Sequence, residues 1–252
     1  MTGPDTFSLT GRVAVVTGGG GWLGADVCAC LASAGAAVAV VGRTTETIEA
    51  AASAVTARGG RAVAVRCDIS DAASVTAMTR DVADRLGPVD VLVNNAAIYP
   101  ERPWTEISED EWDRVLATNL KAFFLCARAA YPGMSDRGYG RIINLTSTTF
   151  FYGFPNATVL DYVTSKGGII GFTRALSREI GPTGITVNAI APGAFEPPPY
   201  DEDYNRWVLD RQSLKRRGVG SDVGNTAVFL ASEAAAFITG QTIAVDGGMV
   251  TN

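Results

Sequence analysis

The sequence predicts an α/β fold in which helices cover both faces of one parallel sheet. Short apolar runs rich in β-branched residues alternate with longer amphipathic segments, which is typical of parallel strands joined by helices. A glycine-rich turn joins the first apolar run to the first helical segment, as in dinucleotide-binding proteins. No linker, repeat or low-complexity tract divides the 252 residues. We therefore expect a single-domain, Rossmann-type, doubly wound sheet of about seven strands that occupies residues 1–252.

Seven apolar runs are the predicted strands, and amphipathic segments separate them. The strands are expected at residues 13–17, 37–41, 62–66, 89–94, 141–145, 185–190 and 242–245. Helical patterns begin near Leu23, Thr44, Ser70, Ser108, Tyr162 and Ser221. Several of them open with Ser, Thr or Asp, whose side chains can cap the first turn of a helix.

Composition narrows the class of protein. Apolar residues make up 47% of the chain and charged residues 19%, so a sizeable core can be buried. The net charge of −5 argues against a nucleic-acid surface, and the basic cluster at 215–217 is too short to change this. The chain has no apolar run of membrane-spanning length, and residues 1–11 lack the pattern of a signal peptide, so we expect a cytoplasmic protein that does not bind membranes. The four cysteines show no C-x-x-C spacing and are expected to be buried thiols.

The chain contains no histidine. This absence excludes Ser-His-Asp and Cys-His nucleophilic catalysis and removes the commonest ligand of catalytic zinc. We therefore predict no metal site, and catalysis must depend on other groups.

Tyr162 and Lys166 are the first candidates for such groups. They stand four residues apart where a helical pattern begins, so their side chains share one face of the helix. A free tyrosine has a pKa of about 10, and acid–base work near neutrality requires a shift of about three units. A neighbouring ammonium favours the phenolate and supplies part of that shift. Taken alone, a tyrosine and a lysine at this spacing are usually no more than an ordinary helix contact.

The glycine-rich turn occupies residues 17–24, with the sequence TGGGGWLG. Its glycines let the backbone approach a pyrophosphate, to which the following helix offers unpaired N–H groups and a positive dipole end. A P-loop is excluded because Ala25 stands where that motif has its lysine.

Several separate motifs together give the chain a resemblance to the classical short-chain dehydrogenase/reductase (SDR) family over nearly its whole length. The motifs are, in chain order, the glycine turn, Cys67-Asp68, Asn94-Asn95-Ala96-Ala97, Asn119, Ser147, Tyr162 with Lys166, Pro192-Gly193 and the segment 240–248. The agreement among them makes an ordinary helix contact a poor explanation of Tyr162 and Lys166.

The resemblance implies a catalytic role for four residues. Tyr162 would be the general acid/base, while Lys166 would lower its pKa and hold the nicotinamide ribose. Ser147 would hydrogen-bond the substrate oxygen, although the neighbouring hydroxyls of residues 146, 148 and 149 could substitute for it. Asn119 would hold a water in a proton relay, and a helix kink without proton transfer is the alternative.

The resemblance also implies a cofactor site, in which Asp68 would contact the adenine. The expected cofactor-binding residues are Gly18, Gly20, Gly21, Trp22, Leu23, Gly24, Arg43, Asp68, Ile69, Asn95, Ala96, Tyr162, Lys166, Pro192, Gly193 and Phe195. NADP(H) is the preferred cofactor and NAD(H) remains open. NAD-dependent members generally have an acidic residue at the position of Gly42, whereas this chain has no carboxylate there and continues with Arg43, whose guanidinium can pair with a phosphate.

The chain departs from the family pattern at four places. Trp22 replaces the middle glycine of T-G-x-x-x-G-x-G, so the turn resembles the G-x-x-G-x-x-G of extended members. The segment between Ser147 and Tyr162 is about two residues longer than usual and carries four aromatic residues, namely Phe150, Phe151, Tyr152 and Phe154. Pro197 stands where a threonine often binds the nicotinamide carboxamide. Ala97 replaces the last glycine of N-N-A-G.

The expected substrate lid is the segment 194–217, which is rich in proline, acidic and aromatic residues. Its aromatic residues are Phe195, Tyr200, Tyr204 and Trp207. If they face the loop at 150–154, the pocket suits an apolar, cyclic or aromatic ketone. They could instead pack within the lid itself.

The family resemblance and the helical patterns at 112–130 and 162–180 also predict a homotetramer. Both patterns carry apolar or small residues on more than one face, and such a helix requires two packing partners.

The function that these motifs predict is an NAD(P)-dependent oxidoreductase that interconverts a secondary alcohol and a ketone by hydride transfer. Two alternatives remain. One is a sugar-nucleotide epimerase or dehydratase, which the glycine spacing suggests, and the other is a cofactor-binding protein without catalysis.

Overall fold

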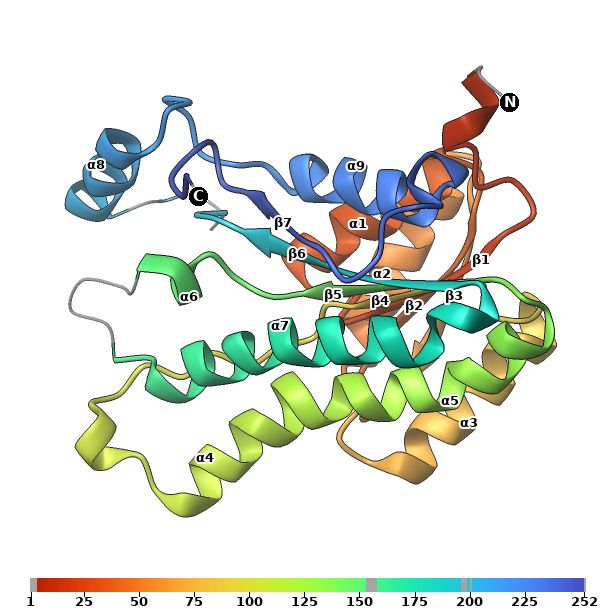
Figure 1. The fold of residues 1–252 in the computed structure, drawn as a ribbon, viewed down its shortest axis with the longest axis horizontal. Helices are drawn as coiled ribbons and strands as arrows, with labels where there is room; N and C mark the ends of the chain where they lie inside the picture. The colour runs from red at the N-terminus through yellow and green to blue at the C-terminus, as the bar shows by residue number, and fades with distance from the viewer. Residues whose placement is uncertain (1–3, 153–157, 196–198, 200, 252) are drawn as a thin grey trace.

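The computed structural model describes residues 4–152, 158–195, 199 and 201–251. Its seven parallel strands form one sheet in the order β3-β2-β1-β4-β5-β6-β7 (Figure 1), so the predicted fold class is confirmed. The strands are β1 (Val13–Thr17), β2 (Ala37–Gly42), β3 (Arg61–Arg66), β4 (Val91–Asn94), β5 (Gly140–Leu145), β6 (Ile185–Pro192) and β7 (Thr242–Val245). The chain order reverses between β1 and β4, and in open α/β sheets this switch point is where ligands bind.

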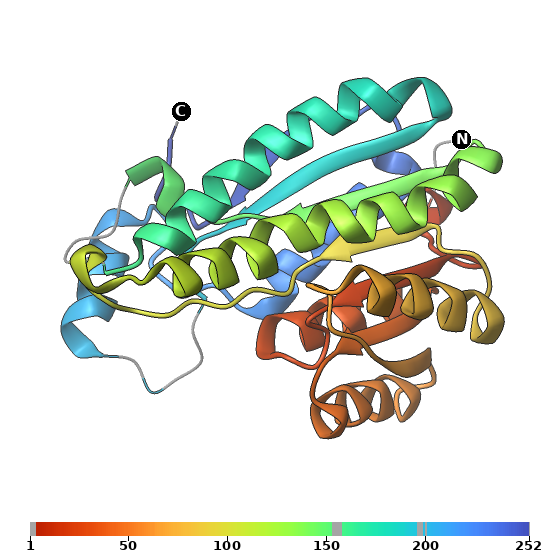
Figure 2. The ribbon, with the colours of Figure 1, turned by 90° about the horizontal axis from the view of Figure 1, so that it is seen from below.

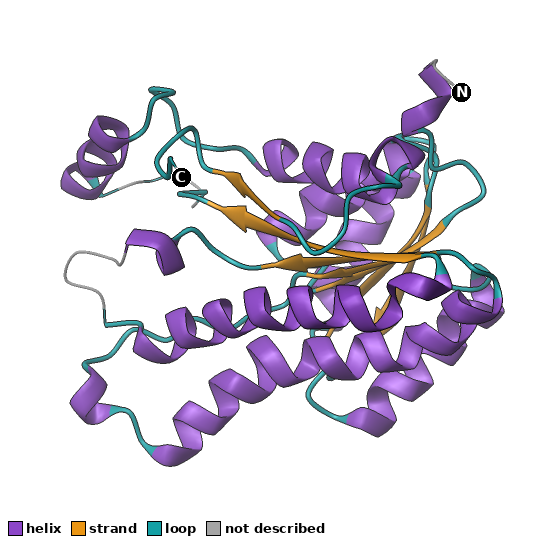
Figure 3. Ribbon diagram, viewed as in Figure 1, coloured by secondary structure: helices purple, strands orange, loops and turns teal. Residues whose placement is uncertain are grey.

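Helices cover both faces of the sheet (Figure 3). One layer contains α1 (Trp22–Ser33), α2 (Thr45–Thr56) and α9 (Gly220–Ala231), and the other contains α3 (Ala72–Arg85), α4 (Glu109–Leu116), α5 (Ala122–Asp136) and α7 (Leu160–Ile180). Strand β1 shows how one strand serves both layers, because Ala14 and Val16 pack on the first while Val13 and Val15 pack on the second. A strand buried on both faces has no polar alternation, which explains its continuous apolar sequence.

The predicted helix starts agree with the structure to within two residues. Not every candidate cap residue makes a side-chain hydrogen bond to the first turn of its helix. Ser108 caps α4 through a capping box with Glu111, and Asp71 caps α3. Thr44 precedes α2 without making a side-chain cap bond. Helix α7 begins at Leu160, before Tyr162, so the tyrosine lies inside its first turn.

Three of the short elements that were not predicted from the sequence lie near the cavity or in the predicted lid, and the others are the 3-10 turns Pro4–Phe7, Trp104–Glu106, Gly181–Thr183 and Glu233–Ala235. The long helical pattern that begins near Ser108 is interrupted by a π-helical turn, Ala117–Lys121, which separates α4 from α5. Helix α6 (Thr149–Tyr152) follows β5, and α8 (Glu202–Arg211) lies in the segment that the sequence marked as a lid. π-turns inside helices occur frequently at functional sites, and this one contains Asn119.

Close packing explains the glycines of the turn after β1. A Cβ on Gly24 would overlap the carbonyl oxygen of Gly18, and one on Gly20 would lie 2.7 Å from Thr47 of α2. Gly18 has a φ of +65°. Gly21 is the least confined of these residues, since its added Cβ would meet only the Gly18 carbonyl oxygen, at 3.3 Å. The tight packing of the turn therefore requires glycine at positions 18, 20 and 24 more strictly than at position 21.

Within the described residues, no helix is long and apolar enough to span a bilayer.

Candidate active site

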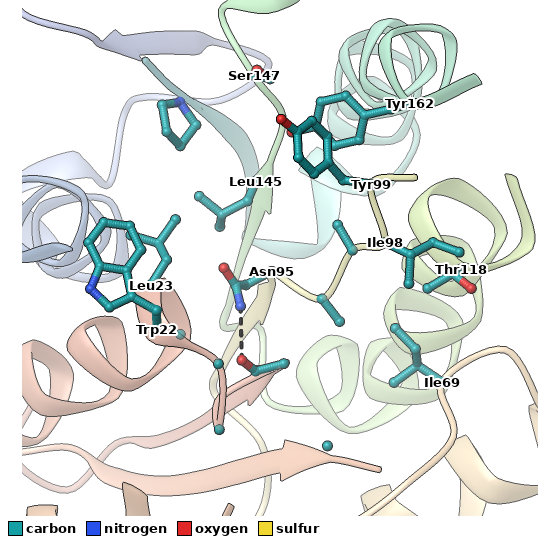
Figure 4. Close-up of a pocket in the computed structure, with 18 of the residues that line it drawn as sticks. Trp22, Leu23, Ile69, Asn95, Ile98, Tyr99, Thr118, Leu145, Ser147 and Tyr162 are labelled. Carbon is teal, nitrogen blue, oxygen red and sulfur yellow. Dashed lines mark hydrogen bonds between the residues drawn. The ribbon is translucent and has the colours of Figure 1, made fainter. Parts of the chain in front are cut away.

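A cavity of about 700 Å³ opens at the carboxyl ends of the central strands (Figure 4). All the predicted cofactor residues line it, together with Ser147, whereas Asn119 does not. The wall also contains residues that the prediction did not include, namely Gly42, Thr44, Thr47, Ile48, Cys67, Ala97, Ile98, Tyr99, Thr118, Leu145, Thr146, Thr149 and Tyr204.

The glycine turn is held against the end of β4 by Asn95. Its side-chain Nδ2 donates to the carbonyl oxygens of Thr17, at 2.9 Å, and Gly18, at 3.2 Å. The Thr17 hydroxyl in turn accepts from the backbone N–H groups of Asn95 and Ala96. These bonds fix the switch point between β1 and β4, and they are a structural reason for an asparagine at this position.

The N-terminus of α1 suits a pyrophosphate. Gly21 occupies the N-cap position and cannot supply a side-chain cap, so the first-turn N–H groups are left for another acceptor. Gly24 allows close approach to the turn, as shown above. Trp22, which replaces the usual glycine, is 42% exposed and adds an indole to the wall of the cavity. These features fit a dinucleotide, whose phosphates the turn and α1 would hold.

Tyr162 and Lys166 lie on one face of α7. The Nζ atom of Lys166 lies 5.4 Å from the centroid of the Tyr162 ring and donates to the carbonyl oxygen of Leu145 at 2.8 Å. The lysine is only 2% exposed, and this burial lowers the pKa of Lys166 to about 7. The sequence suggested a permanently charged ammonium, but the structure adds a desolvation cost that the ammonium must overcome.

Ser147 is a buried residue at the end of β5, and Figure 4 shows it on the same side of the cavity as Tyr162. Two of the three neighbouring hydroxyls that could have replaced it are bonded to backbone carbonyls. Thr146 donates to the carbonyl oxygen of Lys166 at 2.7 Å, and Thr148 donates to that of Pro192 at 3.2 Å. Thr146 lines the cavity, whereas Thr148 does not.

Asn119 is fully buried in the π-turn, and its amide clamps a neighbouring loop. Its Oδ1 accepts from the N–H of Ile98 at 2.8 Å, while its Nδ2 donates to the Ile98 carbonyl and to Ser165 Oγ. This arrangement agrees with the alternative of a kink that positions other residues. A water-mediated link to Lys166 remains a prediction.

Tyr99 is a functional candidate that the sequence prediction missed. Its ring contacts the Tyr162 ring edge to face, with centroids 5.1 Å apart, and its hydroxyl donates to Glu101 at 2.9 Å. Burial and the Glu101 carboxylate raise the pKa of Tyr99 to about 12, so this phenol stays neutral. The sequence contained one indication of this role, since Tyr99 is an aromatic residue two positions after the Asn94–Ala97 motif.

The end of the cavity beside β2 and β3 is bordered by Asp68 and Arg43. Hydrogen bonds from the Ser70 side chain and backbone lower the pKa of Asp68 and leave it ionised. The end of β2 is paired with the end of β3, so that Gly42 lies beside Arg66. The Nε atom of Arg66 donates to the carbonyl oxygen of Arg43 at 3.2 Å. A second cation therefore lies next to Arg43, although the glycine turn contains none.

The predicted lid contributes two of its aromatic residues to the cavity, Phe195 and Tyr204. Trp207 does not line the cavity and stacks on Tyr204, with centroids 6.1 Å apart, as expected for packing within the lid. The other predicted residues of this region, namely Phe154, Pro197 and Tyr200, lie outside the described residues. Gly193 packs against Asp246, where an added Cβ would lie 2.7 Å from the Asp246 Cβ.

Comparisons with known proteins agree with this geometry. Residues 22–250 match a protein-family model described as enoyl-(acyl carrier protein) reductase. The 3-oxoacyl-(acyl-carrier-protein) reductase FabG of Staphylococcus aureus is 40% identical, over 94% of this chain and 98% of that protein. A short-chain type dehydrogenase/reductase of Mycobacterium marinum has a TM-score of 0.92 and 31% identity over 100% of both chains. A gluconate 5-dehydrogenase of Burkholderia cenocepacia, solved with NADP and tartrate, has a TM-score of 0.90 and 33% identity over 97% of each chain.

The lowered pKa of Lys166 predicts a specific dependence of stability on pH. An unfolded lysine keeps its proton up to a pH of about 10.4, whereas folding lowers this pKa to about 7, so folding releases a proton between these values. The free energy of unfolding of the cofactor-free protein, relative to Lys166→Met, should rise with pH across this window by up to about 1.4 kcal/mol per unit. Chemical denaturation of both proteins at pH 7 to 10 measures this difference. A difference that stays constant with pH would contradict the assignment.

Proposed function

The chain belongs to the short-chain dehydrogenase/reductase family, and we propose that this oxidoreductase interconverts a secondary alcohol and a ketone with NADP(H) or NAD(H). The observation that carries the proposal is the placement of Tyr162, Lys166 and Ser147 on the wall of the cavity that the glycine turn also lines. The arrangement offers a proton donor, a cation that tunes it and a hydroxyl for the substrate oxygen, next to a site that suits a dinucleotide.

A nicotinamide cofactor, when held by the residues of this cavity, would supply or accept the hydride. In the direction of reduction, Tyr162 donates its phenolic proton to the carbonyl oxygen, and in the direction of oxidation it accepts that proton. Ser147 stabilises the charge that develops on the same oxygen. An ammonium on Lys166 would stabilise a phenolate on Tyr162, and such a phenolate would offset the burial that lowers the pKa of Lys166.

The relatives favour oxidoreduction over the two alternatives. FabG and the two related structures are named as reductases or dehydrogenases, and none is named as an epimerase or a cofactor sensor. The family model, described as an enoyl reductase, raises carbon–carbon double-bond reduction as a competing reaction. Tyr162 and Ser147 suit the carbonyl reaction, in which the charge develops on the same oxygen that receives the proton, whereas an enoyl substrate must also be protonated on carbon.

We assign NADP(H) as the preferred cofactor. A side chain at Gly42 would bring its Cβ to 2.8 Å from Ile48 Cγ2, so a carboxylate that repels a 2′-phosphate would fit there only if Ile48 moved. Arg43 lines the cavity and its guanidinium suits a phosphate, while Arg66, which does not line the cavity, donates its Nε to the Arg43 carbonyl. The related gluconate 5-dehydrogenase structure contains NADP.

For the substrate we propose an apolar, cyclic or aromatic ketone, with the segment 194–217 closing over it as a lid. Phe195 and Tyr204 from this segment line the cavity, and Tyr99 lines the cavity beside Tyr162. Apolar walls with a few polar groups at the reacting atoms are characteristic of small-molecule sites.

We also propose that residues 1–252 act as one domain in a cytoplasmic homotetramer. The four cysteines are free, as expected in a reducing compartment. Helices α5 and α7 lie on the outer side of one layer (Figure 2), and α5 exposes 46% of Phe124 while α7 exposes 49% of Leu160. A second copy would cover this surface.

Replacing Tyr162 with Phe tests the acid/base assignment. The ring and its contact with Tyr99 are kept while the proton donor is lost, so kcat should fall at least about a hundredfold. The cofactor dissociation constant, measured by fluorescence titration, should change little. Lys166→Ala serves as the contrasting variant and should lose both turnover and cofactor affinity. Wild-type rates in Tyr162→Phe would refute this mechanism.

Arg43→Ala tests the cofactor assignment. One charge-assisted hydrogen bond contributes about 1.5 to 3 kcal/mol, so the ratio of kcat/KM for NADP(H) to that for NAD(H) should fall at least about tenfold. Arg66→Ala should lower the same ratio by a smaller factor, because its Nε is already bonded to the Arg43 carbonyl. If the wild type uses NAD(H) equally well and neither substitution changes the ratio, these arginines do not recognise the 2′-phosphate.

Sedimentation velocity at micromolar concentration tests the tetramer. The expected species has four times the 26.3 kDa mass of one chain. Phe124→Glu places a charge on the outer face of α5 and should shift the distribution to smaller species. A stable monomer in the wild type would contradict the proposal.

A further inference from the structure

Four consecutive residues with hydroxyl side chains, 146–149, follow β5 directly. Each of them has a different hydrogen-bonding arrangement. Thr146 and Thr148 donate to the backbone carbonyls of Lys166 and Pro192, as described above. The other two residues bond to each other. The Thr149 hydroxyl donates to Ser147 Oγ at 2.9 Å, and the Thr149 backbone N–H donates to the same atom at 3.2 Å.

These two bonds define what Ser147 can still do. A serine oxygen has two acceptor lone pairs and one hydrogen to donate. Thr149 occupies both acceptor positions, and only the hydrogen remains available. Within the part of the chain that the structure describes, no acceptor bonds this hydrogen, and Ser147 lines the cavity. The Ser147 hydroxyl can therefore still donate its hydrogen to a group inside the cavity.

Thr149 is itself held in place by the helix that it begins. Helix α6 packs on α7 through Phe150, whose ring lies where a side chain on Gly167 would be. A Cβ on Gly167 would come within 2.7 Å of the Phe150 ring. Gly167 directly follows Lys166, so the contact that anchors α6 lies next to the catalytic lysine. The N–H of Phe151 also donates to the Thr148 carbonyl at 2.9 Å.

We propose that Thr149 is a positioning residue, which directs the Ser147 hydroxyl so that it donates its hydrogen to the substrate oxygen. The inference rests on the proposed ketone reductase function and deepens it. Without the Thr149 hydroxyl, Ser147 regains a free lone pair and can rotate or accept a hydrogen bond. The Ser147 hydroxyl then spends part of its time in arrangements that do not stabilise the developing charge.

Thr149→Val removes this hydroxyl with little change in shape and keeps the backbone N–H. We expect kcat to fall about 2- to 13-fold, as for the loss of one neutral hydrogen bond, while KM and cofactor affinity stay within about twofold. Thr149→Ser keeps a hydroxyl and should restore kcat to within about twofold of wild type. A valine variant with wild-type kcat, or a serine variant as slow as the valine variant, would overturn the proposal.

A double-mutant cycle separates positioning from a direct or structural role. In a Ser147→Ala background, Thr149→Val should cause no further loss of kcat, because the group that Thr149 orients is absent. An equal loss in both backgrounds would show that Thr149 acts independently of Ser147, which would refute the proposal.

Crystal structures of the wild type and Thr149→Val provide a readout that does not depend on ketone turnover. Ser147 should occupy one rotamer in the wild type and several in the variant, with Tyr162 and Lys166 unmoved. An unchanged, single Ser147 rotamer in the variant would reject the positioning role even if the substrate class proposed above were wrong. Absence of ketone turnover in the wild type, with the expected rotamer change, would instead reject the proposed function alone.

Discussion

The burial of one amine links the folding of this protein to its chemistry. Lys166 is almost inaccessible, and its Nζ bonds to the Leu145 carbonyl, so the amine ties α7 to the end of β5. Burial disfavours its charge, and the charge that best offsets this cost is a phenolate on Tyr162, one helical turn away. Gly167 and Gly168, which follow the lysine, let Phe150 and Leu120 pack closely on α7. The same packing that holds the lysine in place therefore also excludes water from its surroundings.

Much of the fold was predictable because its signals are local. Strands β1, β2 and β4 have continuous apolar runs, since helices cover both faces of the sheet, and the outer glycines of the turn are required by backbone contacts. Tyr162 and Lys166 were also recognisable, because their spacing places them on one face of a helix and the other motifs of the chain resemble the same family. The π-turn at Ala117–Lys121 was not predictable, since Asn119 acts there through bonds to the distant Ile98 and Ser165.

The parts of the site that sequence reasoning missed depend on contacts between elements. Arg66 lies beside Arg43 only because β3 pairs with β2 in one register. Tyr99 approaches Tyr162 because the loop after β4 is clamped by Asn119. Thr149 was considered only as a substitute for Ser147, whereas the structure bonds the two residues to each other. In each case the residue type was visible in the sequence and its partner was not.

Turnover of ketones is the most direct test of the central claim that this site reduces a carbonyl group. The purified wild type should be screened with NADPH and NADH against apolar cyclic and aromatic ketones, polar polyol ketones and a 2-enoyl thioester, following cofactor oxidation and identifying the products. The account predicts that at least one ketone is converted to its secondary alcohol, with one cofactor oxidised per product. Tight cofactor binding without reduction of any ketone, or reduction of the enoyl substrate alone, would contradict it.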